Sequence, residues 1–153
     1  MRDRLQDGDG AWTNLLDLYK SGTVATNLVY SYIPNRQMDC TFGRLSGIAC
    51  MFLQCPRGEV ILLPALPTQL PNGMVSGLCA SGGFEVDNLT WTNGQFTGAT
   101  ILSKAGNVCN LRSKWPIIVM QGSNVVSAPM VLPGLYQFAT TAGSNYTILP
   151  ATI

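Results

Sequence analysis

The hydrophobic pattern of this chain changes its period at Pro56, and that change limits the folds open to it. Before Pro56, apolar residues recur every three or four positions in two segments, which is typical of amphipathic helices. The two stripes are Trp12, Leu15, Leu16 and Tyr19, followed by Leu45, Ile48, Ala49 and Phe52. The sequence therefore predicts one helix over about residues 8–20 and another over about residues 43–54.

After Pro56 the chain is rich in glycine and in residues that favour strands. A short apolar run, "EVILLPAL", ends in prolines, and Asn93-Gly94 is a strong signal for a two-residue hairpin. Short strands at regular spacing, with turn residues between them, predict an antiparallel β-sandwich. The predicted fold class is α+β, with two helices in a domain over residues 1–57 and a sandwich domain over residues 58–153.

One predicted strand contains a break in its alternation. Phe84 and Val86 alternate in one register, whereas Leu89 and Trp91 alternate in the other. One extra residue near Asp87-Asn88 would shift the register in this way. The sequence therefore predicts a β-bulge at that point.

Two stretches match the acceptor sequence for N-linked glycosylation, Asn88-Leu89-Thr90 and Asn145-Tyr146-Thr147. These matches make Asn88 and Asn145 candidate glycosylation sites and give a weak hint of an extracellular protein. The polar, acidic N-terminus is unlike a signal peptide, so the sequence predicts no definite localisation.

The composition excludes several classes of partner. Charged residues make up 11% of the 153 residues, and the net charge is +1. A nucleic-acid-binding protein needs a basic patch that neutralises phosphates, so we expect no nucleic-acid partner. No apolar run reaches the roughly 18 residues of a membrane span, so we expect no membrane partner.

The chain contains no histidine, which removes the commonest general base and the commonest metal ligand. A Ser-His-Asp or Cys-His site within one chain is therefore excluded. The cysteines show no C-x-x-C spacing, so we predict neither a metal nor a cofactor. The sequence leaves open the disulfide state of the five cysteines, which are Cys40, Cys50, Cys55, Cys79 and Cys109.

Several longer motifs resemble glycoside hydrolase family 95, the family of 1,2-α-L-fucosidases and related α-L-galactosidases. The family pattern "RLxDGDxA" corresponds to "RLQDGDGAW" in this chain, and "QIDGNFGxxAGIAEMLLQS" corresponds to "QMDCTFGRLSGIACMFLQC". The stretch "LLPALPTQLPNGMVSGLCASGGFEVD" matches a third family segment, and "LYQFATTAGSNYTIL" is similar to the last two strands of the family. The resemblance covers almost the whole chain.

The resemblance implies a fold and a mechanism. Members of the family have an N-terminal β-domain, a barrel of twelve helices and a C-terminal β-sandwich, of which this chain resembles only the last two helices and the sandwich. The family mechanism is inverting, with a glutamate as the acid and a water-activating aspartate on the other side of the sugar. Inverting carboxyl groups lie roughly 6.5–9.5 Å apart. The resemblance places the glutamate in the part of the barrel that has no counterpart here.

By the same resemblance, Asp39 corresponds to the water-activating aspartate. Cys40 replaces the glycine that follows it in the family, and Thr41 replaces the asparagine. From the residues alone, Asp39 or Thr41 would serve as the N-terminal cap of the second helix. We therefore weigh two roles for Asp39, a structural cap and the remnant of a catalytic base side.

Three hypotheses on function remain. The first is a non-catalytic structural, binding or interaction module whose partner is a fucosylated glycan or a protein. The second is a subunit or fragment of an active inverting α-L-fucosidase, and the third is a fragment without a selected function. The apolar stripes also predict that the two helices pack against each other and then either pack on the sandwich or form a homodimer with a second copy through those helices. The candidate aromatic platforms for a sugar are Trp91, Trp115, Tyr136 and Tyr146, although core packing is the commoner role of such residues.

Overall fold

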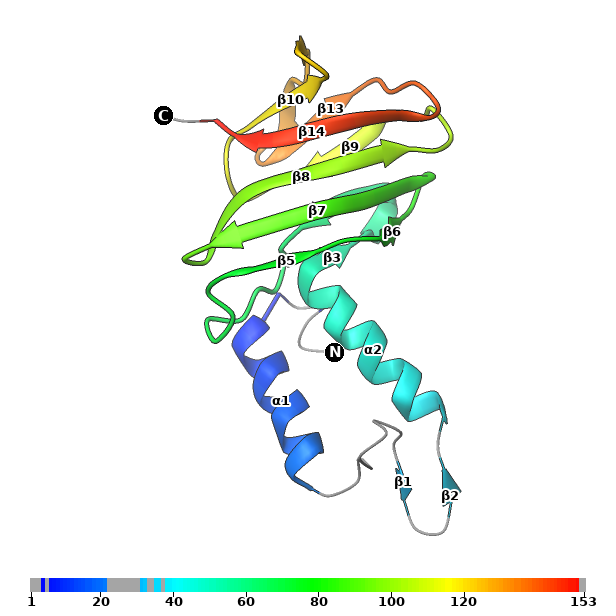
Figure 1. Cartoon of the computed structure of the whole chain (residues 1–153), viewed down its shortest axis with the longest axis vertical. Coiled ribbons are helices and arrows are strands. Elements are labelled where there is room, and N and C mark those ends of the chain that lie inside the picture. The colour runs from blue at the N-terminus through cyan, green and yellow to red at the C-terminus, as the bar shows by residue number, and fades with distance from the viewer. Residues whose placement is uncertain (1–3, 5, 22–30, 33–34, 37, 152–153) are drawn as a thin grey trace. The chain divides into compact units, whose positions relative to one another are not determined.

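The computed structural model describes residues 4, 6–21, 31–32, 35–36 and 38–151 (Figure 1). The chain divides into two compact units. The helical unit consists of Met1–Phe52 and Pro64–Gln69, and the sandwich unit consists of Leu53–Leu63 and Leu70–Ile153. The predicted domain boundary after residue 57 stays a prediction.

The helical unit contains two helices and a small ribbon. Helix α1 spans Gly8–Lys20, as predicted, and helix α2 spans Met38–Phe52. The ribbon pairs β1 (Ser31–Tyr32) with β2 (Asn35–Arg36) in antiparallel fashion. Helices α1 and α2 contact each other within this unit.

Helix α2 begins five residues before the predicted start at residue 43, and this corrects the predicted caps. Asp39 and Thr41 lie inside the helix, so neither is its N-terminal cap. The apolar stripe begins only at Leu45 and does not mark the polar first turns of the helix, and Gly43 lies inside it because a glycine within a helix costs only about 1 kcal/mol. Asp39 occupies the first turn, where a carboxylate still interacts favourably with the helix dipole.

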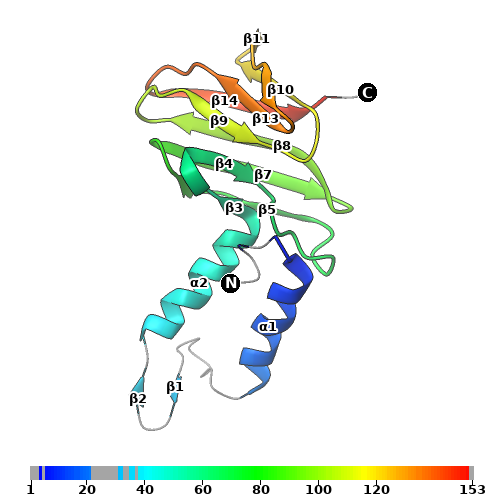
Figure 2. The ribbon, with the colours of Figure 1, turned by 180° about the vertical axis from the view of Figure 1, so that it is seen from behind.

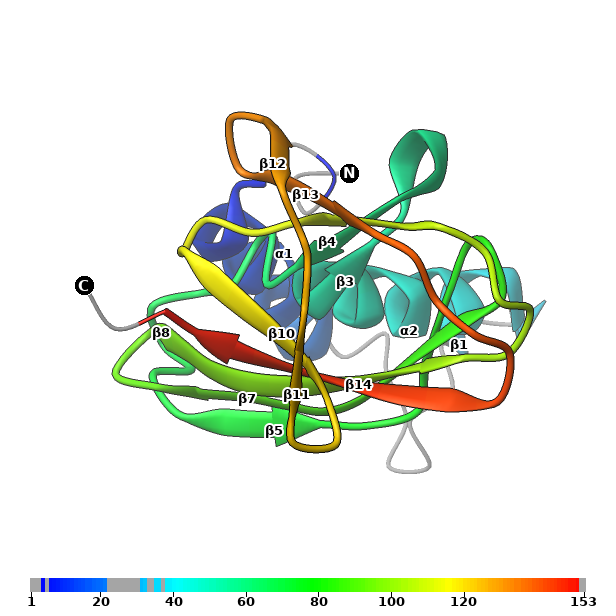
Figure 3. The ribbon, with the colours of Figure 1, turned by 90° about the horizontal axis from the view of Figure 1, so that it is seen from above.

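The sandwich unit consists of two sheets, and the fold class is α+β as predicted. The strands run in the order β11-β10-β14-β8-β7-β5 in the seven-stranded sheet, where β6 also pairs with β7, and β12-β13-β9-β4-β3 in the five-stranded sheet. Figures 2 and 3 show the two sheets as separate layers. The strands of the first sheet are β5 (Gly73–Val75), β6 (Leu78–Ala80), β7 (Phe84–Thr92), β8 (Gln95–Ser103), β10 (Ile117–Gln121), β11 (Asn124–Val126) and β14 (Ser144–Pro150). Those of the second are β3 (Leu53–Gln54), β4 (Glu59–Leu62), β9 (Cys109–Arg112), β12 (Met130–Leu132) and β13 (Leu135–Phe138). A short 3₁₀ helix, η2, spans Pro56–Gly58 before β4.

The core of the sandwich consists of apolar side chains that are almost completely buried. Alternate residues are buried along β7, β9, β10 and β14, so each of these strands gives one face to the core, whereas β4 buries three consecutive residues. Nearly all its sheet pairings are antiparallel, but β4 and β9 run parallel, with Val60 opposite Leu111. The most completely buried side chains include Val60, Leu62, Val86, Leu89, Ile101, Leu111, Val119, Phe138, Tyr146 and Ile148.

Strands β7 and β8 confirm two local predictions. Asn93 and Gly94 connect them with φ angles of 52° and 71°, the left-handed conformations that a type I′ hairpin requires. The register of the pair shifts between Asp87 and Thr90, and Asn88 has a φ of 47°. The predicted β-bulge is therefore present.

The neighbouring edge of the sheet is interrupted at the same level as the bulge. Strands β5 and β6 pair with different parts of β7, and the chain turns between them at Ser76 and Gly77. The Gly77 amide donates to Asp87 Oδ1 over 2.8 Å, and the Asn88 amide donates to Ser76 Oγ over 2.9 Å. These two bonds satisfy amides near the bulge and fix its position.

Candidate functional site

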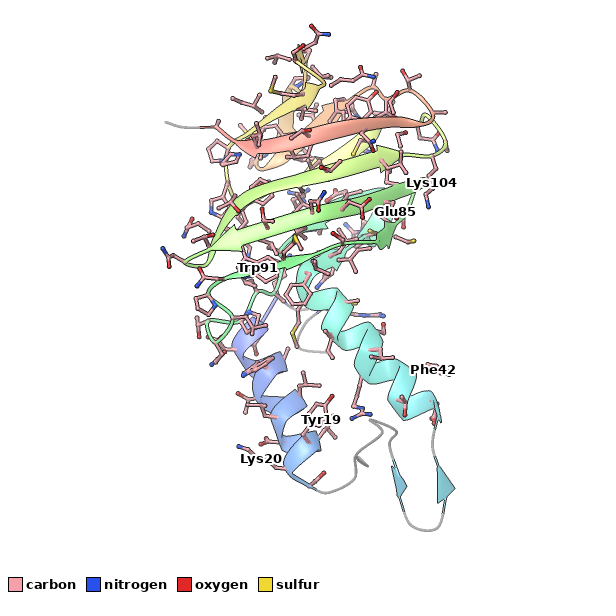
Figure 4. The ribbon with its side chains drawn as sticks, in the orientation of Figure 1. Tyr19, Lys20, Phe42, Glu85, Trp91 and Lys104 are labelled. Atoms are coloured by element: carbon pink, nitrogen blue, oxygen red, sulfur yellow. The ribbon has the colours of Figure 1, made fainter. Side chains whose placement is uncertain are left out.

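The residues that correspond to the catalytic motif lie at the start of α2. Asp39 is exposed in the first turn and Thr41 is half-buried. The ring of Phe42 is 62% exposed (Figure 4). The side chain of Cys40 lies outside the described part of the structure. The site therefore presents one accessible carboxylate beside one accessible aromatic ring.

A cationic side chain lies one turn further along α2. The guanidinium carbon of Arg44 is 5.4 Å from the centroid of the Tyr19 ring on α1, which is within the range of a cation–π interaction. This contact ties the C-terminal half of α1 to the N-terminal half of α2. It therefore orients toward α1 the face of α2 that carries Arg44, one turn after Asp39 and Thr41.

The carboxylates at the start of α1 are engaged in structural bonds. Asp7 caps the helix, because its Oδ1 accepts from the Gly10 amide over 2.9 Å. Asp9 Oδ1 accepts from the amide of Thr68 over 2.7 Å and from its hydroxyl over 3.0 Å. Gly8 lies so close to the carbonyl of Ala65 that a Cβ atom would overlap it. The "DGD" motif thus fastens α1 to the segment Pro64–Gln69.

The carboxylates of the sandwich are engaged as well. Glu59 forms a two-pronged ion pair with Arg112, at 2.6 Å from Oε2 to Nε and 3.1 Å from Oε1 to Nη2. The hydrogen bond from Arg112 lowers the pKa of Glu59 below its ordinary value. Glu85 pairs with Lys104 (Figure 4), which raises the pKa of Lys104, and Asp87 accepts from the Gly77 amide.

Asp39 and Asp17 are the described carboxylates for which no structural bond of this kind is evident. Asp17 is exposed on α1, and Asp3 lies outside the described residues. A glycosidase of the inverting type needs one carboxyl group as acid and a second as base. Asp39 could supply one of these functions but not both. Among the described residues, no group of three or more His, Cys, Asp or Glu side chains is arranged to hold a metal ion.

The candidate aromatic platforms divide into two groups. Trp91 and Tyr146 are core residues, with 4% and 2% of their surface exposed. Trp91 Nε1 donates to the Leu70 carbonyl over 2.9 Å, and Tyr146 Oη accepts from the Thr141 amide over 2.9 Å. Neither can serve as a platform for a sugar.

Trp115 and Tyr136 are half-buried and remain candidates. The Trp115 ring stacks on that of Phe96 with a centroid separation of 6.0 Å. Its Nε1 donates to Gln95 Oε1 over 2.6 Å. These contacts fix the orientation of the Trp115 ring on the sandwich.

Two thiols of the sandwich differ sharply in environment. Cys79 and Cys109 are both free thiols, but Cys79 is exposed on β6 whereas Cys109 is buried in β9. Burial raises the pKa of Cys109 to about 12, with a smaller contribution from Cys55. Cys109 therefore behaves as a core residue rather than a nucleophile.

The predicted glycosylation residues are both accessible. Asn88 is exposed on the bulge of β7, and Asn145 is exposed near the start of β14.

Neither helix of the described residues has the length and apolar character that a membrane-spanning helix needs.

The sequence predicts neither the hydrogen bonds between Asp9 and Thr68 nor the ion pair between Glu59 and Arg112. The signal for the first was present as two patterns, "DGD" and "LLPALPT", that lie far apart in the chain. Neither pattern alone indicates that its polar group contacts the other. The ion pair depends on the parallel pairing of β4 with β9, which no local pattern predicts.

Comparisons with known proteins agree with the motifs. The family model for the glycoside hydrolase family 95, C-terminal domain, matches residues 54–148. Alpha-L-fucosidase 2 of Arabidopsis thaliana is 33% identical over 103 residues. The match covers 60% of this chain but only 12% of the length of that relative.

Proposed function

The chain belongs to glycoside hydrolase family 95, of which it carries the C-terminal domain, and we propose that it acts as a non-catalytic structural, binding or interaction module. One observation carries this proposal: the described carboxylates other than those of Asp39 and Asp17 form hydrogen bonds or ion pairs within the fold. Asp39 therefore lacks an evident partner for the two-carboxylate chemistry of an inverting glycosidase.

Activity measurements test this proposal directly. We expect the isolated chain to show no turnover of a fluorogenic α-L-fucoside or of 2′-fucosyllactose above the rate in buffer. Loss of the general acid alone costs about 10²–10⁴-fold in rate. Turnover that disappears in Asp39→Asn and persists in Asp17→Asn, the matched exposed carboxylate, would contradict the proposal.

A second candidate function is that of a subunit that contributes Asp39 to a fucosidase site completed by another chain. The exposure of Asp39 and Phe42 at the start of α2 favours it, because another protein could reach both residues. The family relation supplies the chemistry, since a relative is an alpha-L-fucosidase.

Complementation separates the two candidates. The Arabidopsis relative would be truncated to remove the aligned segment, and this chain would be added in its place. If the wild-type chain and Asp39→Asn restore fucosidase activity to the truncated relative equally well, the chain is a structural module. Rescue by the wild type alone indicates that Asp39 takes part in catalysis, and absence of rescue by either removes the second candidate.

The exposed apolar side chains of the helical unit favour a protein partner over a sugar. Leu18 and Tyr19 on α1 are 38% and 39% exposed, and Phe42 and Leu45 on α2 are 62% and 60% exposed. Apolar surface of this kind fits a second apolar surface. The occupant that we favour is the part of a family member that precedes the matched segment, because the match covers only 12% of the relative's length.

A binding measurement tests this partner. The chain should bind the truncated relative, and the double variant Phe42→Ser, Leu45→Ser should lose that binding. Met74→Ser is the matched control, because Met74 is 66% exposed but lies on the sandwich. A homodimer in sedimentation, or binding of a fucosylated glycan with no binding of the truncated relative, would overturn the choice of partner.

A further inference from the structure

The seven-stranded sheet has one face turned away from the core. Cross-strand neighbours lie on the same face of a sheet, and the alternation of exposure identifies which side chains point outward. Ile118 pairs with Leu149, Met120 with both Val125 and Thr147, and Met74 with Thr90. The outer sheet face consists of Met74, Cys79, Glu85, Asp87, Asn88, Thr90, Thr100, Leu102, Ile118, Met120, Val125, Asn145, Thr147 and Leu149, so it carries the Glu85 carboxylate as well as apolar side chains.

Large apolar side chains are exposed on the outer sheet face. Val125 is 72% exposed, Met74 66%, Ile118 40% and Leu149 37%. They lie on strands from both edges of the sheet and from its middle, as the order β11-β10-β14-β8-β7-β5 shows. Ile118 and Leu149 are cross-strand neighbours and Val125 pairs with Met120, whereas Met74 lies apart from them, opposite Thr90 on β7. A large exposed apolar patch is unusual on a protein in water unless something covers it.

Both sequon asparagines belong to this same face. Asn88 is exposed where the neighbouring Leu89 is buried, and Asn145 is exposed where Tyr146 is buried. Their strands, β7 and β14, are separated only by β8, so the backbones of these strands lie about 10 Å apart, which is two strand spacings. An N-linked glycan is bulky and solubilising, so carbohydrate at either residue would lie over the outer sheet face.

The local geometry suits modification at each residue. At Asn88 the left-handed φ of 47° turns the chain at the bulge, and the amide nitrogen of its backbone is bonded to Ser76 Oγ. The side-chain amide therefore projects from a fixed backbone. At Asn145 the chain lies in a regular strand opposite Leu102, before β14 begins to pair with β10.

We propose that Asn88 and Asn145 carry N-linked glycans that cover the apolar outer sheet face. The donor is an oligosaccharide joined through a diphosphate to a lipid carrier. A bond forms between Asn Nδ2 and C1 of the first sugar, the bond from C1 to the phosphate oxygen breaks, and the lipid diphosphate leaves. The amide proton passes to solvent through the base of the transferase.

The first test is a mass measurement on the full chain secreted from cultured plant cells behind an added signal sequence. Intact masses before and after enzymatic removal of N-glycans, followed by peptide mapping, should show carbohydrate at both residues. Asn88→Gly should remove one glycan, because glycine also accepts the left-handed backbone, and Asn145→Gln should remove the other. Thr90→Ser and Thr147→Ser keep both acceptor sequences and should keep both glycans. A folded, secreted protein with either asparagine unmodified overturns the proposal.

The second test asks whether the glycans cover the face. Met74 lies on the outer sheet face, whereas Met130 is 60% exposed on β12 of the other sheet. Dilute peroxide should oxidise Met74 several-fold more slowly in the glycosylated protein than in the deglycosylated one, with Met130 unchanged. Equal rates at Met74 in the two forms would overturn the covering role even if both glycans are present.

Discussion

In the sandwich unit, the side chains of Val60, Leu111 and Ile148 have no exposed surface, whereas in the helical unit Phe42 and Leu45 are about sixty percent exposed. The sandwich buries its apolar residues between two sheets of its own. The helices bury Ala11 and Met51 but leave several large apolar side chains exposed to solvent. The sandwich therefore has a core of its own, whereas the helices keep large apolar side chains exposed, and on this difference rests our proposal of a protein partner for the helical unit.

The most direct way to break this comparison is to remove matched leucines from the two units. Leu111→Ala should destabilise the sandwich by about 2–5 kcal/mol, because it empties a fully buried site. Leu45→Ala should change the free energy of unfolding by less than about 0.5 kcal/mol, because Leu45 is largely exposed. Urea unfolding followed by tryptophan fluorescence measures both, with Trp12 as the reporter in the helical unit and Trp91 and Trp115 as the reporters in the sandwich. A large effect at Leu45 would show that the helical unit has its own cover.

Replacing a glycine by alanine should lower stability in the sandwich unit and raise it in the helical unit. A Cβ atom at Gly73 would overlap the ring of Trp91, so Gly73→Ala should cost about 1–3 kcal/mol. Nothing lies within 4 Å of a Cβ atom at Gly47 inside α2, so Gly47→Ala should stabilise the helix by about 0.5–1 kcal/mol. Thermal unfolding followed by circular dichroism measures both. Effects of the same sign would contradict this account of the packing.

The hydrogen bonds that link α1 to the segment Pro64–Gln69 should contribute less to the free energy of unfolding than a buried core side chain does. Asp9→Ala removes the acceptor of two hydrogen bonds from Thr68, and we expect a loss of about 1–2 kcal/mol that the fluorescence of Trp12 reports. Asp17→Ala is the matched control on the same helix and should have little effect. Equal effects of the two variants would show that the link does not hold the helix.

The smallest expected effect is the pH dependence of the Glu59–Arg112 pair. Because its folded-state pKa is lowered, Glu59 adds stability above the pKa of the unfolded chain, and this is lost as the pH falls through the folded-state pKa. Glu59→Gln should therefore destabilise the sandwich by up to about 1 kcal/mol near pH 7 and have no effect in strong acid. Urea midpoints measured across that range would contradict this if the difference persisted in acid.

The sequence predicted the features that local residues determine. The span of α1, the hairpin at Asn93-Gly94 and the bulge near Asn88 each follow from residues within a few positions of one another. The start of α2 was misplaced because the apolar stripe begins only at Leu45 and does not mark the polar first turns of the helix. For the candidate site, the exposure of Asp39 depends on tertiary packing and could not be predicted from its neighbours in sequence.

Contacts between distant segments escaped prediction for the same physical reason. Asp9 contacts Thr68, and Glu59 contacts Arg112, across separations of 59 and 53 positions. No hydrophobic period or turn signal specifies a partner so far away.

The parallel pairing of β4 with β9 has a consequence for how the sandwich forms. The β7–β8 hairpin joins neighbouring segments through a two-residue turn and can form within microseconds. Val60 pairs instead with Leu111, far away in the sequence. Closing so long a loop costs conformational entropy before the contacts between the two strands can form. During synthesis β4 emerges from the ribosome well before β9, so the side of β4 that pairs with β9 waits for about fifty further residues to be made. Pulse-labelling hydrogen exchange during refolding should therefore show protection of β7 and β8 before that of β4.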